Sequence, residues 1–322
     1  MEIFNSTLQQ MLMMFFLILV GFFLRKKSRL PDNSHVTMSK LETFVFIPAL
    51  NLFTQMTGCT AETLSENASL ILYGLGLTIA AVLLAYPLSR LLVRNWKDTA
   101  EAEYRRNVYK YALTFGNYGF MGNYIMLGVF GDDMFYKYML FTFCVIVVSN
   151  SWGLYVLIPK EQNAGVLQNL KKGFLTPPMI SLIVGTVIGL LNLGQYVPAF
   201  MLNAFESAGK CQGPVAMVLV GFVIGGYGFR ELICNKNVYI ASALRLILIP
   251  AAMMLVLKVI GASDELMTLA LICFAAPSGL NTIVFPTAYG GDPKTGASMA
   301  TVSHTLSVAT IPLMYLLFIV IL

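Results

Sequence analysis

The chain has 322 residues, of which 57% are hydrophobic and only 11% are charged. A soluble domain carries about 25% charged residues, so this composition argues against a soluble enzyme or a nucleic-acid-binding domain. The mean hydropathy of +0.73 indicates an integral protein of the lipid bilayer. The five cysteines include no CxxC pair, which argues against a disulfide framework and a zinc site, so no metal is expected.

Apolar stretches recur along the whole chain, each close to the roughly 20 residues that a helix needs to cross a bilayer. The sequence therefore predicts an all-α polytopic membrane protein with ten transmembrane helices. The predicted spans are residues 7–24, 36–56, 69–92, 108–130, 138–158, 177–193, 201–229, 238–260, 266–289 and 298–322.

Lysine and arginine gather in alternate loops, beginning with the cluster at 25–29 and continuing at 90–106. Because basic residues mark the cytoplasmic side of membrane proteins, the odd-numbered loops are predicted to be cytoplasmic. Both termini then face outside, in a multi-pass protein of the plasma (inner) membrane. The net charge of +5 is explained by the basic residues of the predicted cytoplasmic loops, and no nucleic-acid partner is expected.

A polar segment divides the ten predicted spans into five and five. It is predicted to be a short cytoplasmic linker at 161–176, between a first five-helix repeat at 1–160 and a second at 177–322. Five is an odd number, so two halves with one fold would be inverted relative to each other. Such inverted repeats are a recurring plan of secondary transporters.

The fourth span of each half is interrupted by glycine, asparagine or proline. Corresponding broken helices are the best sequence pointer to a transporter's substrate site, and their free N–H groups attract carboxylates. The alternative is that these residues are ordinary kinks that allow close packing. The predicted substrate-binding residues in the two interruptions are Gly116, Asn117, Gly119, Pro277, Ser278, Gly279 and Asn281.

Three further polar residues lie inside predicted spans. Asn51 follows Pro48 by nearly one turn, and it either faces the same cavity or bonds between packed helices. Arg245 and His304 are candidates for coupling, because an intramembrane arginine is costly and histidine titrates near physiological pH. The structural alternatives are an arginine that snorkels or pairs with protein, and a hydrogen-bonded histidine.

In these features the chain resembles the auxin efflux carrier family of transporters. The resemblance implies that the fourth and ninth helices cross at their broken segments and that an anionic substrate binds beside the crossing. It also implies an elevator mechanism and a homodimer held together by scaffold helices. It rests on the order of spans and on residues 46–50 (FIPAL), Asn117, 276–279 (APSG) and 310–313 (TIPL).

Two departures from the plant members of this family bear on the substrate. Gly116 stands where those carriers have proline, and the third span offers only Arg90 where they have an ionisable pair. A small carboxylate such as malate or malonate is therefore expected rather than auxin. No cofactor is predicted, and proton or sodium coupling stays open. The alternatives are a sodium-coupled symporter of the bile-acid-transporter type, a channel and an intramembrane enzyme.

Overall fold

The computed structural model describes residues 2–95, 97–158 and 174–321, so most of the predicted linker at 161–176 lies outside the described residues. The described part is nearly all helical, and its β-structure is one isolated bridge between Gly116 and Ser278. Its helices divide into two groups by their main packing contacts.

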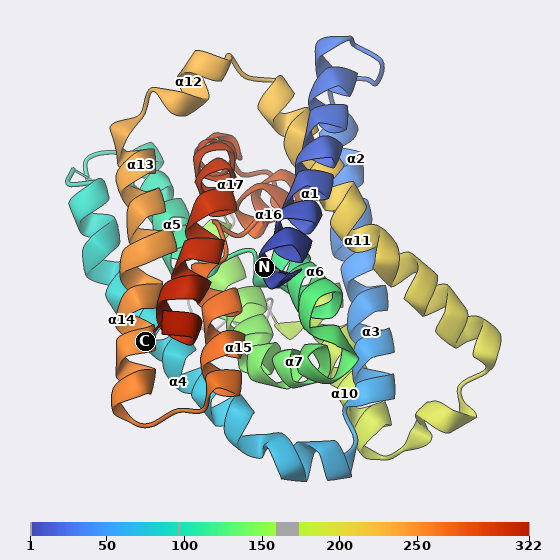
Figure 1. Ribbon diagram of the computed structural model, residues 1–322. Helices are drawn as coiled ribbons and strands as arrows, with labels where there is room; N and C mark the ends of the chain where they lie inside the picture. Colours follow the sequence, from blue (N-terminus) through green and yellow to red (C-terminus); the bar gives the residue numbers. More distant parts are fainter. Residues whose placement is uncertain (1, 96, 159–173, 322) are drawn as a thin grey trace.

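The first group, called the α1/α11 group below, contains the helices that pack around α11. Helix α1 lies along α11, α3 lies between α10 and α11, and Figure 1 shows α1, α3 and α11 along one flank of the molecule. Its members are α1 (Glu2–Lys26), α2 (Ser34–Leu41), η1 (Glu42–Phe46), α3 (Ile47–Gly58), α10 (Pro177–Leu190), η6 (Leu193–Tyr196) and α11 (Ala199–Gly225).

The remaining helices form the second group, called the crossing group. Here α4 packs on α5 and α7, α14 on α15, and α17 on α13 and α15. Its first part is α4 (Ala61–Leu92), α5 (Ala100–Thr114), η2 (Tyr118–Gly122), α6 (Asn123–Ile125), η3 (Met126–Phe130), α7 (Gly131–Val148), η4 (Ser149–Gly153) and α8 (Leu154–Leu157). Its second part is α12 (Phe229–Ile233), α13 (Lys236–Ala243), η7 (Leu244–Leu248), α14 (Ile249–Val259), α15 (Asp264–Ala275), α16 (Asn281–Tyr289), α17 (Lys294–Tyr315) and η8 (Leu316–Ile321).

Six helical stretches in the described residues are long and apolar enough to cross a membrane. They match the second, third, fifth, seventh, eighth and tenth predicted spans. The sixth predicted span forms only the 14-residue helix α10, and the fourth and ninth are divided into shorter pieces. The ten-span inverted repeat therefore stays a prediction. The six stretches are Ser34–Gly58, Ala61–Leu92, Asp133–Leu157, Ala199–Gly225, Lys236–Val259 and Lys294–Ile321.

The surface of the fold is apolar, and several polar side chains are inside. Phe200 is 74% exposed and Leu72 is 68% exposed, whereas Arg245 and Glu42 are 0% exposed. In water such exposed side chains would be unfavourable, but in lipid they face hydrocarbon and cost nothing. This distribution agrees with a multi-pass membrane protein.

Small residues allow α1 and α11 to approach closely. A Cβ atom at Gly221 would lie 1.8 Å from the Ile18 carbonyl oxygen, and one at Gly21 would lie 2.0 Å from the Val218 carbonyl oxygen. Glycine on facing positions lets two helix backbones touch, which is how membrane helices gain dispersion contacts without a hydrophobic driving force.

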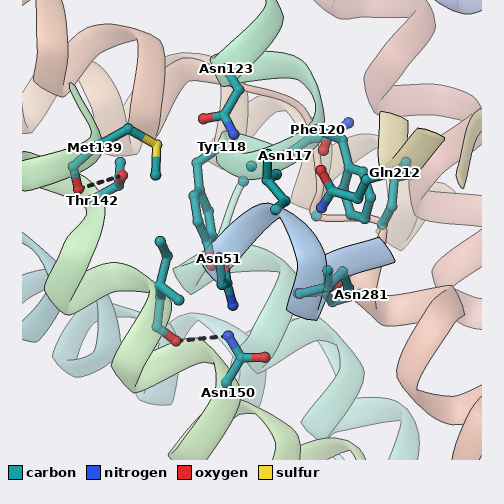
Figure 2. Close-up of a pocket in the computed structure, with 17 residues that line it drawn as sticks. Asn51, Asn117, Tyr118, Phe120, Asn123, Met139, Thr142, Asn150, Gln212 and Asn281 are labelled. Carbon is teal, nitrogen blue, oxygen red and sulfur yellow. Dashed lines mark hydrogen bonds between the residues drawn. The ribbon is translucent and has the colours of Figure 1, made fainter. Parts of the chain in front are cut away.

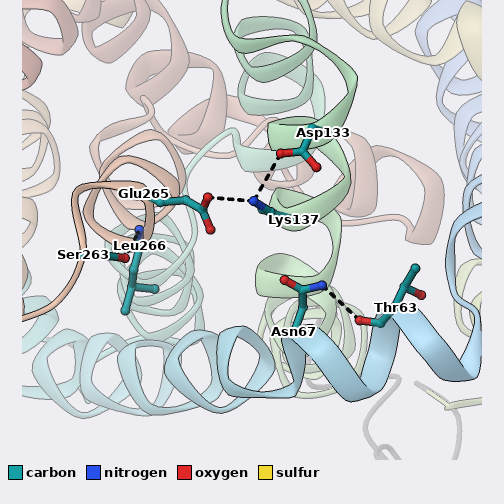
Figure 3. A network of polar contacts seen from close by, with 7 residues as sticks. All are labelled: Thr63, Asn67, Asp133, Lys137, Ser263, Glu265 and Leu266. Carbon is teal, nitrogen blue, oxygen red and sulfur yellow. Dashed lines mark hydrogen bonds and ion pairs between the residues drawn. The ribbon is translucent and has the colours of Figure 1, made fainter.

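An ion-pair network joins α7 to the start of α15, far from the break in that helix (Figure 3). The Lys137 ammonium lies 2.7 Å from a Glu265 carboxylate oxygen and 3.2 Å from an Asp133 oxygen. Ser263 caps the same helix start by accepting a hydrogen bond from the Leu266 N–H. These contacts connect the start of α15 to α7.

Candidate functional site

Two interrupted helices meet in the middle of the crossing group. The first chain interruption separates α5 from η2, and the second separates α15 from α16. The Asn117 N–H donates to the Pro277 carbonyl at 2.7 Å, and the Gly279 N–H donates to the Phe115 carbonyl at 3.2 Å. The two extended segments thus pair as a minimal antiparallel bridge, with Gly116 opposite Ser278.

The sequence explains why the helices stop there. Ala276 adopts an extended conformation (ψ 146°), as expected for a residue that precedes a proline. The first interruption contains no proline; there, position 116 accepts only a glycine. A Cβ atom there would lie 2.1 Å from the Arg245 guanidinium and 2.9 Å from the Ala276 carbonyl oxygen.

Arg245 on η7 holds the ends of both interrupted helices. Its guanidinium donates to the carbonyls of Leu113 and Thr114 at the end of α5, and to those of Cys273 and Ala276 at the end of α15, at 3.2–3.3 Å. The last carbonyls of a helix lack intrahelical donors and carry partial negative charge, which a buried cation offsets. The structure thus places Arg245 behind the crossing, in contact with main-chain groups.

A cavity of about 50 Å³ lies where the crossing meets the α1/α11 group. Figure 2 shows Asn117 between Thr142 on α7 and Gln212 on α11 in that view. Its lining contains amides, glycines and apolar side chains, and none of the lining residues among those described is charged. They are Ile47, Leu50, Asn51, Gly116, Asn117, Tyr118, Gly119, Phe120, Asn123, Met139, Thr142, Ile146, Asn150, Gln212, Gly279, Leu280 and Asn281.

Six of the eight predicted substrate-binding residues line this cavity. Pro277 and Ser278 are not among the lining residues. Pro277 accepts the bridge hydrogen bond, and the Ser278 N–H donates to the Ser303 hydroxyl at 3.1 Å. The six are Asn51, Gly116, Asn117, Gly119, Gly279 and Asn281.

The cavity asparagines have unused hydrogen-bonding atoms. Asn281 donates to the Tyr111 hydroxyl at 3.0 Å, and its Oδ1 has no partner among the described residues. Rotation of this amide by 180° would let Oδ1 accept from Tyr111 and turn the NH2 group away. The amide nitrogen of Asn51 is already used, because it donates a hydrogen bond to the Pro178 carbonyl at 2.9 Å. Asn51 therefore both lines the cavity and joins α3 to α10.

His304 on α17 contacts the cavity residue Asn117. Its Nε2 lies 3.1 Å from the Asn117 amide nitrogen, and its Nδ1 lies 2.9 Å from the Ala300 carbonyl oxygen. The ring is 4% exposed. The two predicted coupling candidates therefore occupy different places: His304 contacts a cavity residue, and Arg245 contacts the helix ends.

Several polar residues at or near the site were not predicted. Gln212, Asn150 and Asn123 line the cavity, and Gln212 directly precedes the Gly213-Pro214 pair that interrupts the run of the seventh predicted span. The sequence feature that could have indicated these three residues is an amide side chain within a predicted span. Glu42 was missed as well; it is 0% exposed at the start of η1, and neither carboxylate oxygen has a partner among the described residues.

Comparison with known proteins identifies the family. Residues 6–169 and 166–315 match the family described as "Membrane transport protein". The uncharacterized transporter YfdV of Escherichia coli K12 is 22% identical over 309 residues, which cover 92% of this chain and 93% of YfdV. The uncharacterized transporter MJ1031 of Methanocaldococcus jannaschii is 25% identical over 62% of this chain, and the match spans 64% of its own length. The chain belongs to the membrane transport protein family of the auxin efflux carrier type.

Proposed function

We propose that this chain is a secondary transporter of small organic anions, carboxylates such as malate or malonate or auxin-like acids. The observation that carries the proposal is the uncharged, amide-lined cavity at the meeting of two interrupted helices. The proposed substrate ligands are the N–H groups that follow the two breaks, together with Asn117 and Asn281. In this proposal Gly116, Gly119 and Gly279 let the substrate approach the main chain, Pro277 and Ser278 hold the breaks, and Asn51 closes the cavity from the other side.

The electrostatics of the site favour an anion. The cavity lining contains the first residues of η2 and α16, and the start of a helix carries partial positive charge. The opposite helix ends, which would attract cations, are already occupied by Arg245. That guanidinium bonds only to carbonyl groups in the described part of the chain, so its charge adds positive potential next to the cavity.

The position of the cavity supports an elevator mechanism. One wall comes from Ile47, Leu50, Asn51 and Gln212 of the α1/α11 group, and the rest comes from the crossing group. In this proposal the crossing group carries the anion past the α1/α11 group, which acts as the scaffold of a homodimer. We further propose that the chain forms ten spans in two inverted repeats, at 1–160 and 177–322, with both termini outside the plasma (inner) membrane.

Uptake into proteoliposomes tests the proposed function. We expect labelled malonate or malate to enter liposomes that contain the wild-type protein. Asn117→Ala and Asn281→Ala should each reduce uptake to background while the protein still inserts and folds. Asn95→Ala, at an exposed position in the α4–α5 connection, is the matched control and should leave uptake unchanged. Unchanged uptake in both cavity variants would contradict the site.

A sodium-coupled symporter of the bile-acid-transporter type is the second candidate. The unpartnered Oδ1 atoms of Asn117 and Asn281 favour it, because hard cations prefer oxygen ligands. Replacing sodium with choline in the same assay distinguishes the two, since only the symporter loses uptake. Single-channel recording on the purified protein tests the channel alternative.

A further inference from the structure

The imidazole of His304 connects the main chain of α17 to a cavity asparagine. Its Nδ1 faces the Ala300 carbonyl oxygen at 2.9 Å, and a carbonyl oxygen can only accept. Nδ1 therefore carries a proton. In the neutral ring Nε2 then holds the lone pair, and at 3.1 Å it accepts a hydrogen bond from the Asn117 NH2 group.

This pairing determines which atom of the Asn117 amide remains without a hydrogen-bond partner. With the NH2 group directed at His304, the carbonyl oxygen Oδ1 has no hydrogen-bond partner among the described residues, and the residue is only 1% exposed. Asn117 lines the cavity (Figure 2). An acceptor without a donor at this place disfavours a carboxylate, and leaving it unsatisfied is itself costly.

Protonation of His304 would reverse the pairing. A proton on Nε2 turns the ring into a donor at both nitrogens, so Asn117 must rotate its amide by 180° and accept through Oδ1. Its NH2 group is then free to donate to a bound anion. We propose that His304 and Asn117 form a proton-controlled switch, in which a proton on His304 Nε2 makes the cavity competent to bind the substrate carboxylate.

This inference rests on the proposed transport of organic anions and adds its coupling ion. One proton binds to Nε2 with each anion, and the imidazolium charge of +1 offsets one carboxylate charge. When the anion leaves, the proton leaves Nε2 for the water on that side, and Asn117 rotates back. The cycle therefore moves one proton together with one anion.

Other titratable groups around α17 are already engaged or lie elsewhere. Among the described residues the two ring nitrogens of His304 bond only to Asn117 and Ala300. Arg245 bonds to four carbonyls, Lys110 bonds to Asn107, and Tyr111 bonds to Asn281. The buried titratable residues on the elements packed against α17 are Arg106, Tyr109, Lys110 and Tyr111 on α5, Cys273 on α15 and Arg245 on η7.

Glu42 is the competing proton carrier. It lies on η1, which packs against α11 and α16, and both of its buried oxygens lack a partner among the described residues. The titratable residues on the elements packed against η1 are His35 and Lys40 on α2, Glu206, Lys210 and Cys211 on α11, and Tyr289 on α16. No described hydrogen bond or ion pair joins any of them to Glu42.

Nitrogen NMR of the histidines tests the starting state without a variant at the site. The chain has two histidines, so a 15N-histidine-labelled His35→Gln protein reports His304 alone. We expect a neutral ring protonated at Nδ1 without ligand, and a ring protonated at both nitrogens at saturating malonate. A ligand-free ring protonated at Nε2 alone would contradict the switch, whether or not malonate is transported.

The pH dependence of malonate binding tests the coupling. Between about pH 9 and about pH 7, where malonate stays fully ionised, wild-type affinity should rise up to about tenfold per pH unit, because one proton is bound with each anion. His304→Gln should lose this dependence, since its Oε1 accepts from Asn117 but binds no proton. A thermal unfolding curve like that of the wild type confirms that the variant folds.

Glu42→Gln is the matched control and should keep the wild-type pH dependence. A dependence retained in His304→Gln, or lost in Glu42→Gln, would overturn the proposal. Absence of binding by both malonate and malate at every pH would contradict the proposed function, and the NMR spectrum of the ligand-free protein would still decide the state of His304.

Discussion

Arg245 is the residue whose role the structure clarifies most. The sequence allowed either a residue that takes part in coupling or a structural arginine that snorkels or pairs with protein, because an arginine inside a membrane span is costly. The four carbonyls around its guanidinium belong to the ends of α5 and α15. This geometry favours a positioning role, in which Arg245 keeps the two helix ends together and acts on the cavity through its charge.

Removing the Arg245 guanidinium should loosen the crossing. We expect Arg245→Met to leave four buried carbonyls without donors and to lower the free energy of unfolding by on the order of 3 kcal/mol. Amide hydrogen exchange at Asn117 and Gly279, whose N–H groups form the bridge, should accelerate. Arg105→Met, at an exposed position on α5, is the control. Unchanged exchange together with lost malonate binding would instead assign Arg245 to the substrate.

Individual site residues differ in how well the sequence predicts them. The glycines and asparagines of the two interruptions stand out because they break apolar runs, and six of the eight predicted substrate residues line the cavity. Gln212 lies on α11 and Asn150 on η4, and the sequence does not determine how those helices rotate. Glu42 was missed because a single carboxylate near the start of a span resembles a polar helix end.

At the scale of elements, the interruptions were predictable and their contact was not. Pro277 locates the second break through the backbone preference of the residue before a proline, and Gly116 marks the first as a glycine inside an apolar run. The bridge between the breaks joins residues more than 150 positions apart, and only the resemblance to a transporter family implied that they cross. The predicted sixth span at 177–193 begins with α10 at Pro177 and extends three residues beyond its end at Leu190, because apolar residues continue into the following turn.

The crossing depends on the missing side chain at Gly116. In Gly116→Ala the new Cβ atom would lie 2.1 Å from the Arg245 guanidinium, so the guanidinium or the bridge must move. We expect a loss of about 1–3 kcal/mol in the free energy of unfolding, together with lost malonate uptake.

Gly76→Ala is the control for this substitution. Gly76 is exposed on α4, and a Cβ atom at this position would have no neighbouring atom within 4 Å, so alanine should stabilise the helix by about 0.5–1 kcal/mol. Thermal unfolding of the purified proteins measures both effects. Equal stability of Gly116→Ala and the wild type would show that the crossing tolerates the methyl group.

At the scale of the whole molecule, the described helices form two groups that meet at the cavity. The composition alone predicted a membrane protein, and the apolar surface agrees with it. The number of spans, their orientation and the homodimer depend on the bilayer and on a second copy of the chain. Those properties therefore stay predictions.

Motion between the two groups is testable by cross-linking. The Ser39 hydroxyl of α2 donates to the Val284 carbonyl of α16 at 2.6 Å, so the groups touch there. With the five native cysteines replaced, a bifunctional thiol reagent that bridges Ser39→Cys and Val284→Cys should abolish uptake, and a reductant should restore it.

A bridge within the α1/α11 group is the matched control. The side-chain oxygens of Gln55 on α3 and Thr186 on α10 lie 3.4 Å apart, so Gln55→Cys and Thr186→Cys can be linked in the same way. This bridge should leave uptake intact. Equal uptake through both bridged proteins would contradict a relative movement of the groups.

Equilibrium binding of labelled malonate to the purified protein tests whether the crossing holds an anion. We expect one saturable site per chain in the wild type and in Asn95→Ala. In Asn281→Ala we expect at least tenfold weaker binding, which corresponds to about 1.4 kcal/mol of binding free energy. Binding of equal strength in Asn281→Ala and the wild type would contradict an anion site at the crossing.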